Sequence, residues 1–594
     1  MVWTESARGP CLDDRGRERR PGKARGKHAR TSPRTAGDQL LLDTARHSAA
    51  RALALTLLGL ASTAVALALP ATLGHTLDLL LTRRPGASGW VLLCTALICV
   101  PAALDALDGL LAGTTAARST ARLRHRLLRH VLAAGPRATN RFGPGDLVTR
   151  LVGNAADAGT APGTLAAAAS SVVAPLGGIV ALGLIDPWLA VAFLAGAPLL
   201  ALLLRALARA SSDCVAQYQR LQGDIAGRLM EAVGGARTIA AAGTAGRERD
   251  RILEPLPALS GQGHRMWRVQ GRAAAQAVTV VPLLQIAVLA VAGLRLNQGL
   301  LSVGDLLAAS RYAVLATGVG MLVGHLNAAV RARTAAGRLA DVLSVPLPPY
   351  GPDVRRLPPG DGTLELRGVG AVRGGRHILR DLDLVVPGGT SLAVVGRSGT
   401  GKSVLAALAG RLADPDSGVV TLDGVPLPQL GHDELRRAVG YAFERPALLG
   451  GTIGGTVAFG VADPGPDAVA AAARAARADG FVRRLPRGYA TPCAEAPLSG
   501  GEAQRLGLAR AFAHAGRVLI LDDATSSLDT VTEREVAAAL VRDVAARTRI
   551  VVAHRASTAA RADAVAWLEG GRVRAVGTHE SLWRCAAYRA VFGG

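Results

Sequence analysis

Long apolar runs alternate with arginine-rich stretches over the first half of the chain. Between Arg51 and Asn327, six runs come close to the roughly 20 apolar residues that a helical membrane span needs. They cover about 52–75, 90–113, 164–185, 187–207, 276–295 and 302–327. The third and fourth runs meet at Asp186-Pro187, which predicts a tight turn. The long connections between runs keep a helical pattern, so we expect helices that continue well beyond the bilayer.

The pattern changes after Leu343, where a Pro/Gly-rich stretch predicts a linker. From about residue 363 short β-like runs alternate with helical Ala/Arg segments, which predicts a mostly parallel sheet flanked by helices. The runs are Leu364–Leu366, Leu382–Val386, Ser391–Val395, Val518–Leu521 and Ile550–Ala553. We therefore divide the chain into a tail (1–45), a transmembrane domain (46–345), a linker (346–362) and an α/β domain (363–594).

Charge sets the expected orientation of the spans. The formal charge of +23 comes from 68 Lys and Arg against 45 Asp and Glu. Eight Arg lie in the connection at about 116–165 and eleven at about 205–275, against three on the other side. This asymmetry predicts that the long connections and the N-terminus are cytoplasmic in a multi-pass protein of the cell membrane. The basic excess then needs no nucleic-acid partner.

The tail at 1–45 shows no apolar run that could build a core, and we expect it to be disordered. Between Arg15 and Arg34 it holds nine basic residues and one acid, Glu18. Two interpretations stay open: attraction to anionic lipid headgroups, or a solvated tail with no role. The six Cys show no pairing or zinc spacing, so we expect neither a disulfide framework nor a metal-thiolate site.

The motif G-x-x-x-x-G-K-S directly follows the strand at 391–395 and precedes a helical segment. This context predicts a phosphate-binding loop, because glycines let backbone N–H groups curl round phosphates at a helix N-terminus. The predicted ATP-binding residues of the loop are Gly396, Arg397, Ser398, Gly399, Thr400, Gly401, Lys402 and Ser403. Lys402 would reach the phosphates and Ser403 would offer a hydroxyl to Mg²⁺. Lys402 is also one of only three lysines in the chain.

A second motif, RVLILDDATSSLD, places Asp522 at the end of a predicted buried strand. Open parallel sheets bind ligands at this edge. We expect Asp522 to bind ATP through Mg²⁺ and Asp523 to orient the attacking water.

The block LSGGEAQR at 498–505, between these two motifs, gives the chain a resemblance to the ATP-binding cassette (ABC) family. The apolar half resembles the exporter-type membrane domain, with FGPGDLVTRL and GGARTIAAAG similar to its cytoplasmic loops. The resemblance implies an α-helical six-span transmembrane domain followed by an α/β P-loop ATP-binding cassette domain. It implies an ATPase and half-transporter that must pair with a second half to export a substrate.

The resemblance also implies roles for individual residues. Two ATP molecules would lie between head-to-tail cassettes, and each would contact the signature block of the opposite chain. His554 would be catalytic beside Asp523, and Asp529 would signal across the dimer. The signature residues, which would contact the partner's ATP, are Leu498, Ser499, Gly500, Gly501 and Glu502.

Four departures from the family pattern bear on catalysis. Asp523 replaces a usual Glu, Glu444 stands where a Gln normally couples Mg²⁺ to the membrane domain, and Arg373 stands where an aromatic stacks on adenine. The segment before the signature block is about two residues short, which puts the contact with the cytoplasmic loops in doubt. Three departures fall in the chain's own site, which resembles the degenerate subunit of a heterodimeric exporter. A homodimer in which Asp523 works slowly is the alternative.

Charges lie well inside two predicted spans, Arg311 in the sixth and Asp105 and Asp108 in the second. Intramembrane charge normally faces a cavity or a partner, so these residues are candidates for the substrate pathway, or for an Arg–Asp pair between spans. Three other function classes stay open beside export: a soluble cassette acting on nucleic acid, which the spans disfavour, an inward transporter of the same fold, and a non-transporting regulatory cassette.

Overall fold

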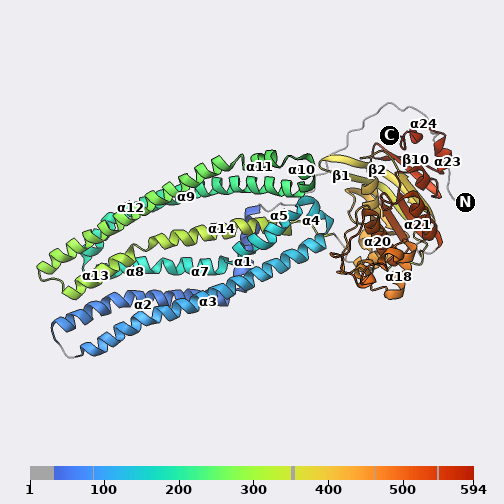
Figure 1. Ribbon diagram of the computed structural model, residues 1–594. Helices are drawn as coiled ribbons and strands as arrows, with labels where there is room; N and C mark the ends of the chain where they lie inside the picture. The colour runs from blue at the N-terminus through green and yellow to red at the C-terminus, as the bar shows by residue number, and fades with distance from the viewer. Residues whose placement is uncertain are drawn as a thin grey trace. The chain divides into compact units, whose positions relative to one another are not determined.

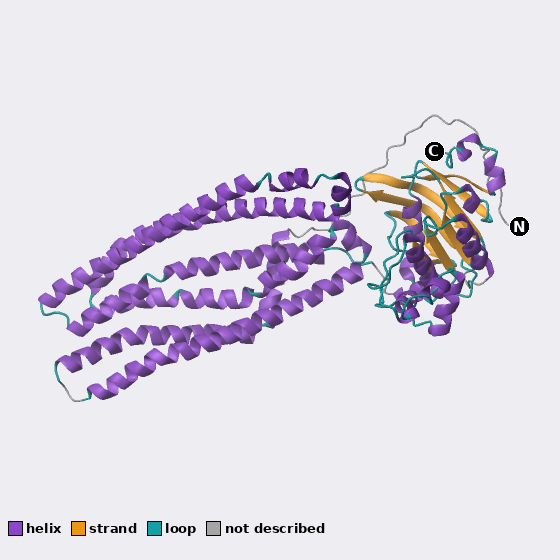
Figure 2. Ribbon diagram, viewed as in Figure 1, coloured by secondary structure: helices purple, strands orange, loops and turns teal. Residues whose placement is uncertain are grey.

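The computed structural model describes residues 33–83, 86–348, 355–460, 462–542, 544 and 547–593. The described chain divides into two compact units. One is helical and ends at Val345, and the other begins at Pro346 and includes the short segment Ala133–Arg137. Figure 1 shows the long helices of the first unit, and Figure 2 shows the strands and helices of the second.

The helical unit is built from elements of very unequal length (Figure 1). In chain order they are α1 (Pro33–His47), α2 (Ala49–Leu81), α3 (Ala87–Ala134), α4 (Pro136–Arg141), α5 (Pro144–Thr149), a π-helical turn (Arg150–Asn154), α6 (Ala155–Gly159), α7 (Ala161–Ser171), α8 (Val173–Ile185), α9 (Pro187–Gly234), α10 (Ala236–Ala242), α11 (Ala245–Leu253), α12 (Leu256–Asn297), α13 (Val303–Ala316) and α14 (Val319–Leu343). The longest, α3 and α9, have 48 residues each. At about 1.5 Å per residue such helices are far longer than a bilayer is thick.

Four helical segments of the described chain are long and apolar enough to cross a membrane. They are Ala49–Leu81, Ala87–Ala134, Pro144–Ile185 and Thr279–Asn297. These segments contain the predicted spans 52–75, 90–113 and 164–185, and nearly all of 276–295. The predicted fourth span begins as a shorter apolar helix, Pro187–Leu199. The predicted sixth span is divided between α13 and α14, which separate at Thr317-Gly318. The count of six spans therefore stays a prediction.

The predicted turn at Asp186-Pro187 is confirmed and well anchored. Asp186 is buried and caps α9 by accepting a hydrogen bond from Trp188 N at 2.9 Å. Pro187 is the first residue of α9, where its missing N–H costs nothing. Arg295, at the end of α12, forms an ion pair with Asp186 at 2.6 Å. A buried carboxylate is thus paired with a cation on a neighbouring helix, which joins two helix ends.

The structure differs from the predicted disordered tail over its last third. Residues 1–32 lie outside the described residues, but Pro33–His47 form helix α1. Leu40 is buried, and Asp38 accepts two hydrogen bonds from Arg333 of α14. A Cβ on Gly37 would lie 2.9 Å from the Cα of Gly337 on α14, so the two helices cross at a glycine contact. The apolar run at 40–42 gave α1 a face to bury, which the basic composition of the tail obscured.

The α/β unit contains two sheets rather than the one mostly parallel sheet predicted. The strands are β1 (Leu364–Arg373), β2 (Arg376–Val386), β3 (Ser391–Val395), β4 (Ser417–Leu422), β5 (Val425–Pro426), β6 (Val439–Phe443), β7 (Val518–Asp522), β8 (Thr548–Val552), β9 (Ala564–Glu569) and β10 (Arg572–Gly577). A four-stranded antiparallel sheet has the order β2-β1-β4-β5. A six-stranded sheet has the order β10-β9-β3-β8-β7-β6 and is parallel except at β10. The prediction of a parallel sheet was wrong for β1 and β2, because they form a hairpin across Gly374-Gly375.

Helices and short 3₁₀ turns pack around the sheets (Figure 2). The helices are α15 (Lys402–Ala409), α16 (His432–Ala438), α17 (Ile453–Val457), α18 (Pro466–Ala475), α19 (Asp479–Val482), α20 (Gly500–Ala513), α21 (Thr530–Arg542), α22 (Ala556–Ala559), α23 (His579–Trp583) and α24 (Ala586–Arg589), and the 3₁₀ turns are Leu427–Gln429 and Gly488–Ala490. One apolar core joins both sheets to α15, and a second joins α17, α18 and α20 to β7. The six-stranded sheet is therefore held rigidly from both sides, which fixes the ends of its strands.

Candidate functional site

One edge of the six-stranded sheet gathers residues from three separate motifs. The predicted phosphate loop leaves the end of β3, Asp522 ends β7, and His554 follows β8. Strand β8 lies between β3 and β7, and all three run parallel. Because parallel strands end at the same edge, the loop, the two aspartates and the histidine converge there. The sheet order, which the sequence does not reveal, brings them together.

The phosphate loop needs its glycines for conformation and for space. Gly399 and Gly401 have φ of +82° and +99°, in the left-handed region that favours glycine. A Cβ on Gly396 would lie 2.5 Å from the carbonyl oxygen of Leu568. Gly401 is the cap of α15, so backbone N–H groups at the helix start face the loop interior. Such a loop is built to bind an anion through its backbone.

Lys402 is buried at the first position of α15. Its Nζ donates hydrogen bonds to the carbonyl oxygens of Gly396 at 2.9 Å and Arg397 at 3.3 Å. Burial lowers the pKa of the Lys402 amine, and the carboxylates of Asp523 and Asp522 oppose that shift. The loop thus encloses a cation that lies near two acids.

Asp522 offers a carboxylate oxygen suited to a cation. Its Oδ2 accepts a hydrogen bond from Tyr441 Oη at 3.1 Å. Its Oδ1 is buried and has no hydrogen-bond partner among the described residues. Burial, followed by the negative charge of Asp522, raises the pKa of Tyr441 well above its usual value, so the phenol keeps its proton and donates. Since oxygen ligands suit Mg²⁺, the unsatisfied Oδ1 fits a magnesium site.

Asp523 and His554 form the second polar pair of the site. His554 Nε2 lies 3.0 Å from Asp523 Oδ2. Asp523 has φ of +52°, an uncommon conformation for a residue with a side chain. Burial raises the pKa of the Asp523 carboxyl, while the charge of His554 and its hydrogen bond lower it. A carboxyl whose ionisation depends on a neighbouring histidine has the character expected of a group that handles water protons.

The signature block forms the start of helix α20. Ser499 caps this helix by accepting a hydrogen bond from Glu502 N. In return, Glu502 Oε2 accepts hydrogen bonds from the N–H and the hydroxyl of Ser499, both at 2.8 Å. The backbone N–H of Ser499 is the main cause that lowers the pKa of Glu502. Glu502 therefore completes a capping box, and the exposed N-terminus of α20 carries a negative charge.

Gln504 is a residue of the site that the motifs did not single out. It is buried in α20, and its Nε2 donates to the carbonyl of Glu444 at 2.9 Å and to Ser526 Oγ at 2.8 Å. Its Oε1 accepts a hydrogen bond from Ser527 N at 2.9 Å. One amide thus ties the signature helix to the end of β6 and to the loop after Asp523. Its position two residues after Glu502 gave no sign of this role.

The other departures lie around this centre. Glu444 follows Phe443, which is paired in register with Asp522, but its side chain is exposed and lies 3.9 Å from Arg445. Arg373 ends β1 and lies 3.4 Å from Asp416 in an exposed ion pair. Asp529 accepts hydrogen bonds from the backbone N–H groups of Val531 and Thr532, which caps α21. The structure therefore places the Asp529 carboxylate at a helix N-terminus, where its charge is stabilised.

An ion pair between the buried Glu533 and the half-exposed Arg555 holds the segment that carries His554. Glu533 of α21 is buried and accepts hydrogen bonds from Arg555 Nη1 at 2.5 Å and Thr558 Oγ1 at 2.6 Å. Arg555 also reaches the carbonyl of Leu528 at 3.4 Å. The residues after Asp523 and those after β8 are thereby fixed to one another.

The two candidate pathway residues in the helical unit are not brought together as a pair. Asp105 on α3 accepts a hydrogen bond from Ser62 Oγ on α2 at 3.2 Å. Arg311 is exposed on α13, and no ion pair joins it to Asp105 within the part of the chain that the structure describes. The alternative of an Arg–Asp pair between these two spans is therefore not seen.

Comparison with known proteins defines the class. The family model for the ABC transporter transmembrane region matches residues 52–318, and the model for the ABC transporter cassette matches residues 379–526. The chain is 56% identical to the ABC transporter ATP-binding protein RamA of Streptomyces coelicolor over 539 residues, which cover 90% of this chain and 84% of that protein. The chain therefore belongs to the ABC transporter family.

Other matches are more distant. The multidrug efflux ATP-binding/permease protein Rv0194 of Mycobacterium tuberculosis is 36% identical over 65% of this chain and 32% of its own length. An ATP-dependent lipid A-core flippase of Legionella pneumophila is 39% identical over 36% of each chain. The solved structure of a bacterial Atm1-family ABC exporter with ATP bound has the same fold, with a TM-score of 0.78 and 24% identity over 92% of this chain and 98% of that one.

Membership in the family settles the broad activity. The predicted fold class, a helical membrane domain followed by an α/β cassette, is confirmed. The chain is a multi-pass membrane protein and a half-transporter, whose cassette binds ATP and hydrolyses it to drive transport. Half-transporters of this family act as dimers.

Proposed function

We propose that the chain is one half of a dimeric exporter that moves an amphipathic small molecule, lipid or peptide outward across the cell membrane. The observation that carries this proposal is the joining of an ATP site to a membrane unit of the Atm1-like exporter fold. The activities named for two relatives, multidrug efflux and lipid A-core flipping, support outward transport of amphipathic compounds. The arginine-rich connections between spans support a cytoplasmic cassette and N-terminus.

In this proposal the phosphate loop, residues 396–403, holds the ATP phosphates of the chain's own site. Lys402 exchanges its contacts with loop carbonyls for the phosphates, and Arg373 stacks on the adenine in place of an aromatic ring. Ser403 and Asp522 hold Mg²⁺, with the unsatisfied Asp522 Oδ1 as the supporting observation. Mg²⁺, when bound, neutralises phosphate charge during hydrolysis. Glu444 directly follows the neighbouring strand β6. Its carboxylate would be a further ligand of Mg²⁺, or would couple the magnesium site to the membrane unit.

The hydrolytic residues would be Asp523 and His554. Asp523 accepts a proton from the attacking water, and His554 both holds that carboxylate and contacts the γ-phosphate. Asp is one methylene shorter than Glu, so the water lies farther from its base. A misplacement of about 1 Å can cost on the order of 10²-fold in rate. We therefore propose that this chain's own site binds ATP and hydrolyses it slowly.

The signature block, residues 498–502, serves the ATP held by the second half-transporter. The start of α20 is exposed, as contact with another chain requires. The residues just before Asp529 lie beside the start of α20, since a Cβ on Gly501 would lie 3.2 Å from the carbonyl oxygen of Ser527, and Asp529 would signal between the two sites. Because three departures fall in the chain's own site while the LSGG block is intact, we favour a heterodimer whose other member carries the Glu. Arg311, exposed in the single chain, and Asp105 would line the substrate pathway.

Membrane vesicles test the direction of transport. Inside-out vesicles from cells that make the full chain with its native partner are incubated with MgATP, and their contents are profiled by mass spectrometry. We expect a compound to accumulate with ATP in inside-out vesicles and not with the K402A variant. ATP-dependent accumulation in right-side-out vesicles instead would show import. ATP turnover with no ATP-dependent accumulation in either would favour a regulatory cassette.

A further inference from the structure

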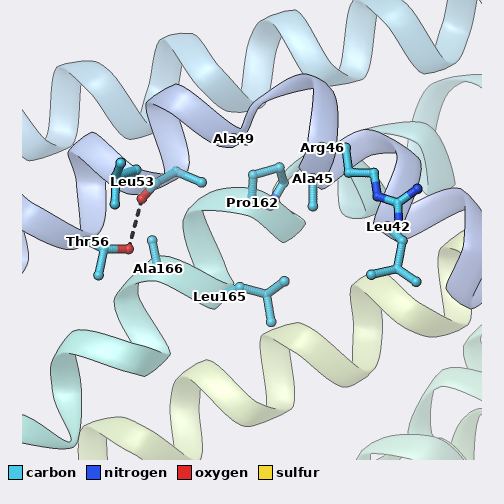
Figure 3. Close-up of a pocket in the computed structure, with 10 residues that line it drawn as sticks. Leu42, Ala45, Arg46, Ala49, Leu53, Thr56, Pro162, Leu165 and Ala166 are labelled. Carbon is cyan, nitrogen blue, oxygen red and sulfur yellow. Dashed lines mark hydrogen bonds between the residues drawn. The ribbon is translucent and has the colours of Figure 1, made fainter.

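An apolar groove of about 460 Å³ lies in the helical unit, where α1, α2 and α7 meet. Figure 3 shows side chains from all three helices around it, with Arg46 at one end. The volume falls within the range of about 300–1,000 Å³ found for small-molecule sites. The groove is far along the chain from the phosphate loop, so it is no part of the ATP site.

The walls of the groove are apolar and open to the surroundings. Leu42, Leu53 and Leu165 line it, and their exposed fractions are 58%, 60% and 53%. Thr56 also lines it, but its hydroxyl donates a hydrogen bond to the carbonyl of Ala52 at 2.8 Å. A molecule bound in the groove therefore does not have to offer that hydroxyl a polar partner. Such a surface fits a hydrocarbon chain.

Arg46 gives the groove its one charge. Its neighbours on α1 are already paired: Asp43 with Arg126 at 2.7 Å, and Asp38 with Arg333. The Arg46 guanidinium is exposed and has no ion pair or hydrogen bond with any other described residue. A planar guanidinium donates two parallel hydrogen bonds to a phosphate or carboxylate.

The groove also lies where a lipid headgroup would be. Arg46 comes shortly before the apolar run of α2, on the side of the membrane that carries the arginine-rich connections. The cytoplasmic leaflet holds anionic lipids, which attract basic side chains next to a span. An unpaired cation beside an open apolar groove at this boundary complements both parts of such a lipid.

We propose that the groove binds one anionic phospholipid, with its phosphate on Arg46 and an acyl chain along Leu42, Leu53 and Leu165. The bound lipid bridges α1 to α2 and α7, and so links the N-terminal helix to the first span. Free phosphate would leave the apolar walls uncovered, so the occupant is the lipid. This site depends on the membrane location of the chain and not on export.

Photolabelling tests the site. The full chain is placed in phosphatidylcholine nanodiscs with a trace of phosphatidylglycerol that carries a diazirine on its acyl chain. We expect label in peptides that cover 42–56 and 162–166. R46A should reduce that label about fivefold, the effect of one basic residue at a lipid surface. R46K keeps the charge but loses the paired donors, so it should restore part of the label. R51A removes a nearby arginine that does not line the groove, so it should change nothing.

Further arms separate the other occupants. L165W fills the groove and should reduce labelling even with Arg46 present, while the thermal unfolding of the protein stays unchanged. Diazirine-labelled phosphatidylcholine should label the groove weakly, and millimolar inorganic phosphate should not compete. The proposal is overturned by equal label in R46A and R51A, or by equal labelling with the two lipids. Competition by free phosphate would also overturn it. So would increased label after deletion of residues 1–32, because those residues, and not a lipid, would then be the occupant of the groove.

Discussion

His554 Nε2 lies 3.0 Å from Asp523 Oδ2 at the edge of the six-stranded sheet. Asp523 directly follows β7 and His554 comes two residues after β8, so the ends of neighbouring parallel strands hold the pair. Asp523 makes this contact from an uncommon left-handed backbone conformation, with φ of +52°. It makes the ionisation of the proposed base depend on one histidine.

This pair predicts a specific pH dependence of ATP turnover. Burial raises the pKa of Asp523, so the carboxylate is lost, and turnover falls, at a higher pH than for an exposed aspartate. Since His554 lowers that pKa, H554A should move the acid limb to still higher pH. H554Q keeps a hydrogen-bond donor and should move it less. A pH profile of single-turnover hydrolysis by the three proteins checks this, and identical acid limbs would remove the pair from the mechanism.

Lys402 is predicted to be irreplaceable even by arginine. The loop encloses the amine against the carbonyls of Gly396 and Arg397, and a planar guanidinium is too large for that space. K402R should therefore weaken ATP binding by about tenfold or more, close to the effect of K402A, a loss of roughly 1.4 kcal/mol. Binding of a fluorescent ATP analogue to the full chain measures this. D523A is the control and should bind as the wild type does.

The Asp522 carboxylate is predicted to carry the magnesium dependence of binding. D522N keeps the size of the side chain and removes the charge, so Mg²⁺ should no longer tighten ATP binding as it does in the wild type. The same titration with and without Mg²⁺ gives the difference. A D522N variant that still responds fully to Mg²⁺ would place the ion elsewhere.

The pair between the buried Glu533 and the half-exposed Arg555 should matter more for stability than a fully exposed pair in the same unit. R555A leaves a buried carboxylate without its cation, which costs about 3 kcal/mol, whereas R547A breaks an exposed pair with Asp361 and costs about 1 kcal/mol or less. Thermal unfolding of the full chain should show a much larger loss for R555A. The double variant E533Q/R555M, which removes both charges, should recover part of it. Equal losses for R555A and R547A would contradict this account.

Much of the site could be predicted because its motifs carry their own context. The phosphate loop and Asp522 each directly follow a short apolar strand, and that arrangement leaves little choice of fold. The apolar spans could be predicted from hydropathy. The turn at Asp186-Pro187 could be predicted from the residue types that favour turns. Ser499 and Glu502 are three residues apart, a spacing that signals a capping box, and the sequence could have revealed it.

Other features depend on contacts that the sequence does not display. Helix α1 buries Leu40 where it crosses α14, and there Gly37 meets Gly337, which is 300 residues further along the chain. Gln504 acquires its role from the sheet order, which brings Glu444 and Ser526 beside α20. The antiparallel pairing of β1 with β2 reflects a hairpin turn at two glycines rather than any difference in strand composition.

The turnover of the purified full chain alone, reconstituted in lipid, tests the central claim most directly. The account predicts a wild type that binds MgATP and hydrolyses it slowly, because the Asp523 carboxylate is one methylene short. D523E should then raise turnover, by up to the order of 10²-fold, with ATP binding unchanged. The account would be contradicted if the wild type turned over ATP at rates ordinary for a transporter. The contradiction would also require that D523A abolished this turnover and that D523E did not increase it.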